Sequence, residues 1–282
     1  MRSESFVQLN SRNRTLDLAR PVVMGILNVT PDSFSDGGAY VETARALDHA
    51  LGMVEQGAAI VDVGGESTRP GADPVDEREE MARVLPLIEA LRAHSDVFIS
   101  IDTIKPRVMR EACAAGADMI NDVMALRGPG ALEAACDTQA AVCLMHMQGQ
   151  PRTMQKAPVY DDVVADVRSF LGARVAACRD ASIDDSRICL DPGFGFGKTL
   201  EHNLALMRNL HAFVGDGYPV LVGVSRKSMF VKLHGYDDMS SRIHASVTSA
   251  FWAATQGAGI IRSHDVAHTV EALTLAAALA DN

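Results

Sequence analysis

The chain has 282 residues, of which 48% are hydrophobic and 22% charged. This composition is ordinary for a globular protein with a sizeable apolar core, and it excludes an intrinsically disordered chain. The formal net charge of -10 argues against a nucleic-acid partner, because no basic stripe is available to neutralise phosphates.

The first residues are polar and charged, and no stretch approaches the roughly 18 consecutive apolar residues of a membrane span. We therefore expect a cytoplasmic protein with no membrane partner. The 5 cysteines are odd in number and form no C-x-x-C pair. This spacing favours buried thiols over a disulfide framework or a zinc site.

Short apolar runs, each ending in a polar residue, alternate along the chain with helix-length amphipathic segments. The eight runs, in chain order, are 22–28, 60–66, 98–102, 119–122, 141–146, 188–191, 220–225 and 260–265. They are continuous rather than alternating in polarity, which is typical of parallel strands that helices cover on both faces. Between the runs the helical period is visible, for example at Val84, Ile88 and Leu91.

Signals for helix ends agree with this pattern. A glycine that suits a left-handed helix end precedes a strand at Gly57, Gly116 and Gly257. Pro106 suits the first turn of a helix, and Asp265 could cap the last helix.

Strict alternation of strands and helices is compatible with a barrel or with an open, doubly wound sheet. The count of eight units favours the (β/α)8 TIM barrel, in which one domain of roughly 250 residues is normal. We therefore predict a single barrel domain over 21–282. Residues 1–20 fall outside the pattern and are predicted to form a short N-terminal extension that covers the barrel bottom.

Two connections from a strand to the next helix are long and rich in turn-forming residues, 29–40 and 67–76. In a barrel such loops lie on the catalytic face, where they act as lids or binding loops.

Polar residues at the strand ends are the informative set, because a barrel brings them to one mouth. They are Asn28, Glu66, Asp102, Asn121, Asp122, His146, Asp191, Ser225 and His264. Any one of them could be a helix cap, but together they indicate a functional site. Asp102, Asn121 and Asp191 offer two carboxylates and an amide, which suits a flat, guanidine-like heterocycle with several N–H donors.

Basic residues occupy a different part of the predicted mouth. Arg69 lies in the second long loop, Lys227 follows the seventh strand, and Arg262 and His264 belong to the eighth. Loops after strands seven and eight of a barrel commonly bind phosphate. For most basic residues the alternative is a solvated ion pair on the surface. This alternative has least support for Arg262, because that residue is embedded in a strand.

Two motifs point to other chemistry and are set aside. Residues 191–199 end like a phosphate-binding P-loop, but Pro192 occupies the position of the required first glycine. His146 lies between two methionines, yet no second cluster has the spacing of a copper site. Methionine packing is the commoner explanation of such a pattern.

Read together, the motifs resemble the dihydropteroate synthase family, the folate-pathway enzymes that sulfonamides target. The resemblance covers nearly the whole chain. It rests on 24–38 (MGILNVTPDSFSDGG), 62–71 (DVGGESTRPG), 101–103 (IDT), 121–123 (NDV), 145–149 (MHMQG), 191–197 (DPGFGFG), 225–228 (SRKS) and 262–265 (RSHD).

The resemblance implies a barrel enzyme, usually a homodimer, that uses Mg2+ as its cofactor. Its substrates would be 6-hydroxymethyl-7,8-dihydropterin pyrophosphate and p-aminobenzoate, and its products 7,8-dihydropteroate and pyrophosphate. Loss of pyrophosphate would precede attack by the arylamine, in an SN1-like displacement. Stabilising the leaving group is then the main catalytic task.

The resemblance also implies roles for individual residues. Those expected at the pterin are Asp102, Asn121, Asp191, Lys227, Met145, Phe196 and, stacking over the ring, Arg262. Asn28 is expected to contact Mg2+, and Thr68, Arg262 and His264 to hold pyrophosphate. The residues expected to close over p-aminobenzoate are Asp36, Thr68, Arg69, Pro70 and Ser228.

Two positions depart from the family pattern, Ala245 where glycine is frequent and Ser263 where an apolar residue is common. Two alternative functions remain at this point. One is a corrinoid-dependent methyltetrahydrofolate methyltransferase, whose barrel shares the Asp and Asn pocket but gives Arg262 and His264 no task. The other is a noncatalytic pterin-binding paralogue.

Overall fold

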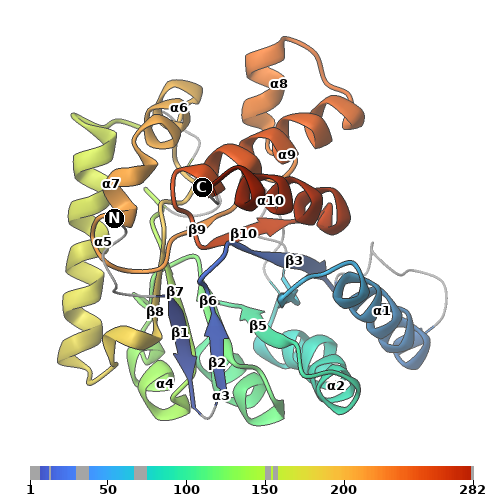
Figure 1. Ribbon diagram of the computed structural model, residues 1–282. Helices are drawn as coiled ribbons and strands as arrows, with labels where there is room; N and C mark the ends of the chain where they lie inside the picture. Colours follow the sequence, from blue (N-terminus) through green and yellow to red (C-terminus); the bar gives the residue numbers. More distant parts are fainter. Residues whose placement is uncertain are drawn as a thin grey trace.

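Parallel strands alternate with helices along the chain, as predicted (Figure 1). The computed structural model describes residues 7–12, 14–29, 38–66, 75–149, 154 and 158–280. Its strands are β1 (Gln8–Ser11), β2 (Arg14–Asp17), β3 (Val22–Asn28), β4 (Ile60–Gly64), β5 (Phe98–Asp102), β6 (Met119–Asp122), β7 (Ala141–Met145), β8 (Ile188–Asp191), β9 (Leu221–Val222) and β10 (Ile260–Ser263).

The helices lie around the outside of these strands (Figure 1). They are α1 (Gly38–Glu55), α2 (Glu77–His94), α3 (Pro106–Ala115), α4 (Ala131–Thr138), α5 (Val163–Asp180), α6 (Leu200–Arg208), α7 (Leu210–Val214), α8 (Ser228–His234), α9 (Met239–Thr255) and α10 (Val266–Ala280). A short 3-10 turn, Asp185–Arg187, precedes β8.

The sheet closes on itself, which decides between the two predicted architectures. The order of its 8 strands is β8-β7-β6-β5-β4-β3-β10-β9. A parallel bridge between Leu190 and Val220 joins β8 to the residue that precedes β9. The barrel prediction is therefore confirmed, and the open doubly wound sheet was the wrong alternative.

Successive residues of each strand point in turn into the barrel interior and out toward the surrounding helices. On β5, Ile99 and Ile101 pack with helix residues in the main core, whereas Phe98 packs in the barrel interior. Ser100 and Asp102 follow on the same side of the strand as Phe98. The interior is thus apolar at the strand starts and polar at the strand ends, which places polar side chains at one mouth.

Several strands end earlier than predicted, and polar residues beyond their ends make side-chain contacts. Strand β4 stops at Gly64, and the side chain of Glu66 pairs with Lys105. Strand β9 has only 2 residues, since beyond it the Ser225 hydroxyl accepts a hydrogen bond from the backbone of His264 at 3.1 Å.

The predicted helix ends are confirmed. Gly57, Gly116 and Gly257 have φ values of 98°, 124° and 97°, a left-handed region that favours glycine. Pro106 is the first residue of α3. Asp265 directly precedes α10, as predicted, and its carbonyl accepts a hydrogen bond from the Thr269 amide at 3.0 Å. Its carboxylate, however, pairs with Arg226.

A two-stranded hairpin, β1–β2, covers the bottom of the barrel. Leu9, Leu16 and Leu18 pack in one buried cluster with interior residues at the strand starts, including Ile60 and Phe98. The hairpin therefore completes the apolar floor below the polar mouth. The boundary at residue 20 between extension and barrel stays a prediction.

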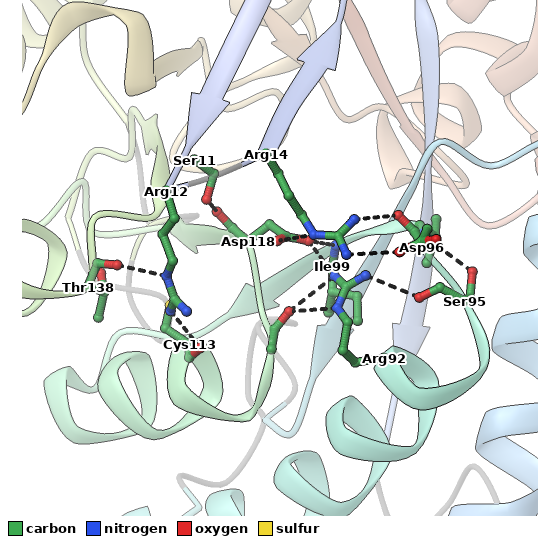
Figure 2. A network of polar contacts seen from close by, with 12 residues as sticks. Ser11, Arg12, Arg14, Arg92, Ser95, Asp96, Ile99, Cys113, Asp118 and Thr138 are labelled. Atoms are coloured by element: carbon green, nitrogen blue, oxygen red, sulfur yellow. Dashed lines mark hydrogen bonds and ion pairs between the residues drawn. The ribbon is translucent and has the colours of Figure 1, made fainter.

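Asp118, at the start of β6, anchors the hairpin through a network of polar contacts (Figure 2). Its carboxylate receives hydrogen bonds from Arg92 Nη2 at 2.5 Å and from the Ile99 amide at 2.9 Å, and Arg14 Nε lies 3.5 Å away. The Ser11 hydroxyl donates to the Asp118 carbonyl. One buried carboxylate thus joins the hairpin to α2 and β5.

We expect Asp118→Ala to lower the free energy of unfolding by about 3 kcal/mol, because it leaves buried cationic and amide donors without their acceptor. Urea unfolding measures this change. Asp96→Ala is the matched control, since the Asp96 side chain also pairs with Arg14 but is 98% exposed. Equal loss of stability in both variants would contradict the anchoring role.

The cysteines are free thiols, and four of them are buried, as predicted. Among the described residues, no helix combines the length and the apolar character that a membrane span needs.

Candidate active site

Four strands bring their last inward positions to the same level of the barrel mouth. The parallel register pairs Asn28 with Gly64, Gly64 with Asp102, and Asp102 with Asn121. A Cβ atom added to Gly64 would lie 3.5 Å from Asn28 Oδ1 and 3.6 Å from Asp102 Cβ. Glycine therefore leaves room for the two side chains to flank it.

Arg262 reaches across the barrel interior from β10 and joins two carboxylates. Its Nη2 donates to Asp102 Oδ2 at 2.9 Å, and its Nε donates to Asp62 Oδ2 at 2.6 Å. Asn121 Nδ2 donates to the same Asp62 oxygen at 3.2 Å. The predicted residues Asp102, Asn121 and Arg262 thus form one network, and Asp62 is the member that the sequence reasoning missed.

Burial makes the ionisation of this network sensitive to its surroundings. Burial raises the pKa of Asp102 to about 7, an effect that Arg262 opposes and the neighbouring Asp62 reinforces. Burial alone would lower the pKa of Arg262, but Asp62 and Asp102 raise it above its ordinary value. The guanidinium therefore stays charged, and the Asp102 carboxyl group changes its charge close to neutral pH.

The opposite wall of the mouth comes from β7, β8 and the loops that follow β8 and β9. Met145 pairs in register with Asp191, and Asp191 Oδ1 accepts a hydrogen bond from the Gly193 amide at 2.7 Å. Lys227 Nζ lies 4.3 Å from the centre of the Phe196 ring. Burial raises the pKa of Asp191 and lowers that of Lys227 to about 8.

The turn that carries Lys227 is held by polar contacts. Arg226 has a φ of 55°, uncommon for a residue with a side chain. Its backbone amide donates to Ser246 Oγ at 2.8 Å, and its guanidinium pairs with Asp265 after β10. The turn places Lys227 in the mouth, and Ser228 becomes the first residue of α8.

His264 lies beside this turn. Its Nδ1 lies 3.0 Å from the Ser225 hydroxyl. The loops after β9 and β10 are therefore joined twice, by Ser225 with His264 and by Arg226 with Asp265. The pairing holds the loop that carries Lys227 against the one that carries His264.

Comparison with known proteins identifies the family. The model of the pterin binding enzyme family matches residues 24–264. Dihydropteroate synthase of Escherichia coli (strain K12) is 52% identical over 267 residues, which are 95% of this chain and 94% of that protein. The chain belongs to the dihydropteroate synthase family.

Solved structures of the family agree with the fold. Yersinia pestis dihydropteroate synthase, in a complex with a sulfonamide drug, has a TM-score of 0.92 and 50% identity, covering 98% of this chain and 100% of that one. The enzyme of Xanthomonas albilineans in complex with 7,8-dihydropteroate has a TM-score of 0.88 and 47% identity, covering 98% and 99%.

Three of the polar strand-end residues do not face the mouth. Glu66 pairs with Lys105, and Asp122 accepts from the amides of the turn that follows it. His146 packs edge-on against Phe170 of α5, with 4.9 Å between the ring centres. Asp122 and His146 each directly follow an inward-facing residue, Asn121 and Met145, so they leave the strand on the helix side. Glu66 lies beyond the end of β4.

Four predicted site residues, Asp36, Thr68, Arg69 and Pro70, lie outside the described residues. The two departures from the family pattern are both accommodated. Ser263 is buried and accepts hydrogen bonds from the Asp265 amide at 3.1 Å and the Thr269 hydroxyl at 2.9 Å. Ala245 is half-buried on α9.

Proposed function

We propose that the residues gathered at the barrel mouth carry out the dihydropteroate synthase reaction. In it, p-aminobenzoate displaces pyrophosphate from 6-hydroxymethyl-7,8-dihydropterin pyrophosphate, and 7,8-dihydropteroate forms. The enzyme is a transferase. The assignment rests on the contacts of Arg262 with Asp62 and Asp102 at the mouth. It is supported by the related enzyme of Xanthomonas albilineans, which was solved in complex with 7,8-dihydropteroate.

The pterin is assigned to the carboxylates and the amide at the mouth. A pterin edge presents adjacent N–H donors, and a buried carboxylate that accepts them forms charge-assisted hydrogen bonds. Asp102, Asn121 and Asp191 supply the acceptors and one amide donor. Met145 and Phe196 line the pocket, and the Arg262 guanidinium stacks over the ring.

Pyrophosphate is assigned to the basic side, at Arg262 and His264 together with Thr68. As the exocyclic C–O bond breaks, pyrophosphate takes the electron pair and the electron-rich pterin supports the cation left on its methylene carbon. Fixed cations stabilise the charge that develops on the leaving group. The amine of p-aminobenzoate, enclosed by Asp36, Arg69, Pro70 and Ser228, then forms the C–N bond and loses a proton.

The donor set at the mouth fits Mg2+. This ion prefers oxygen ligands and keeps several waters, so one or two protein oxygens suffice when substrate phosphates complete its shell. Asn28 Oδ1 lies at the mouth beside Gly64, and we assign Mg2+ to it. In the described part of the chain, no group of three or more His, Cys, Asp or Glu side chains could hold a metal. When bound, Mg2+ would offset negative charge on pyrophosphate.

A homodimer is also proposed, with α10 at its centre. Leu275 and Leu279 lie on successive turns of this helix and are 54% and 66% exposed. Glu271, one turn before Leu275, is the only acidic residue in α10, so the face beyond it offers apolar side chains to a second copy. A cytoplasmic location remains the prediction made from the sequence.

An assay of pyrophosphate release tests the proposed function. We expect fast release only with both substrates and Mg2+, with one dihydropteroate formed per pyrophosphate. Pterin binding without any release would identify a noncatalytic paralogue. Methyl transfer from methyltetrahydrofolate to a corrinoid, without pyrophosphate release, would identify the methyltransferase alternative.

A further inference from the structure

The glycine-rich loop after β8 packs tightly against the segment that follows β7. Gly193 and Gly197 have φ values of 70° and 61°. A Cβ atom added to Gly193 would lie 1.8 Å from the His146 carbonyl oxygen, and one added to Gly197 would lie 2.5 Å from that of Gln148. Only glycine permits this approach of the two backbones.

Lys198, at the end of this loop, is buried and points inward to the backbone. Its side-chain nitrogen lies 2.8 Å from the Gly193 carbonyl oxygen, 3.0 Å from that of Phe196 and 2.9 Å from His146 Nδ1. Burial lowers the pKa of Lys198 to about 7. In its charged form the group has three N–H donors, and these three acceptors match them. The residue is only 2% exposed.

The acceptor on His146 is available because the ring is neutral. Burial, reinforced by Lys198, lowers the pKa of His146 to about 3. Neutral imidazole has one ring nitrogen free to accept, and here Nδ1 faces the ammonium. Lys198 therefore joins the end of β7 to both sides of the glycine-rich loop.

The contacts of Lys198 argue against a phosphate-binding P-loop. In a P-loop, the lysine of the G-K-[ST] ending extends to the phosphates of a nucleotide. Here its donors are used by Gly193, Phe196 and His146, and Thr199 caps α6 by accepting from the His202 amide at 3.2 Å. The motif serves to hold a loop in place.

The loop in turn positions groups at the mouth. The Gly193 amide donates to Asp191 Oδ1, and the His146 amide donates to the Asp191 carbonyl at 2.9 Å. Lys227 Nζ donates to the Phe194 carbonyl. A shift of the loop would therefore move Asp191 and displace Lys227.

We propose that Lys198 is a positioning residue for pterin binding, which fixes the loop carrying Asp191 and Phe196 by cross-linking Gly193, Phe196 and His146. This rests on the proposed function, in which Asp191 and Phe196 contact the pterin. Lys198 itself touches no substrate. Its removal acts on the pterin side of the mouth and leaves the p-aminobenzoate side unchanged.

The test is calorimetric titration of Lys198→Met with 6-hydroxymethylpterin, together with steady-state kinetics. We expect the Kd for the pterin to rise roughly tenfold or more, as is typical when a supporting contact behind a binding group is lost. At saturating pterin substrate, the KM for p-aminobenzoate should stay within about twofold of the original value. Lys232→Met, on the exposed face of α8, is the matched control and should change neither constant.

A second variant covers the case in which Lys198→Met does not fold. His146→Phe keeps a ring beside Phe170 but removes the acceptor, and it should also weaken pterin binding without raising the KM for p-aminobenzoate. Unchanged pterin binding in the folded variants, or equal loss for both substrates, would overturn the positioning role. Asp191→Asn separates the two hypotheses: if it too leaves pterin binding unchanged, the proposed pterin site is wrong.

Discussion

Replacing Arg262 by alanine should lower kcat/KM for the pterin substrate by roughly 10²- to 10³-fold, the usual cost of removing a fixed donor that stabilises developing charge. The variant also leaves Asp62 and Asp102 as neighbouring buried carboxylates without their shared counter-ion. Their mutual repulsion would raise the pKa of Asp102 further. Steady-state pyrophosphate release measures the effect.

Lysine at the same position is the informative comparison. It keeps the positive charge but cannot donate in a planar fork to two carboxylates at once. We expect Arg262→Lys to recover only a small part of the lost activity. Arg208→Ala, on the exposed side of α6, should behave as the unaltered protein. Full activity in Arg262→Lys would show that charge alone suffices and that the two-carboxylate geometry has no role.

Pterin affinity should depend on pH through Asp102. Its carboxylate accepts N–H donors best when ionised, and its pKa is raised to about 7. Below that pH the free protein holds a proton that the ligand must displace, so affinity falls as pH falls, approaching about tenfold per unit. Above it, affinity levels off while Lys227, with a pKa of about 8, remains charged.

Asp102→Asn tests this account, because asparagine cannot ionise. It should weaken binding of 6-hydroxymethylpterin by roughly 100-fold at pH 7.5 through loss of a charge-assisted pair. It should also remove the pH dependence between pH 5.5 and 7.5, measured by calorimetry with a ligand that lacks phosphate. A pH profile that survives the substitution would assign the titration to another group.

The sequence predicted the barrel well because apolar runs and glycine stops are local signals. Residue parity within a strand is a further local signal. Asp62 lies two residues before Gly64 in an otherwise apolar run, and this spacing places it on the inward face below the mouth. The same parity would have assigned Asp122 and His146 to the helix side.

Other features depend on contacts between distant segments. The sequence around Lys198 resembles a P-loop, and only the packing of the loop against His146 shows where its ammonium group points. Asp118 anchors hairpin residues that lie far from it in the sequence; Ser11, for example, is 107 positions away. No periodicity within either segment predicts such a partner.

A crystal structure of the protein with a bound pterin is the most direct test of the central claim. We expect the pterin edge to lie within hydrogen-bonding distance of Asp102, Asn121 and Asp191, with its ring stacked on the Arg262 guanidinium. A pterin bound elsewhere, with the contacts of Arg262 to Asp62 and Asp102 unchanged and no ligand at the barrel mouth, would contradict it.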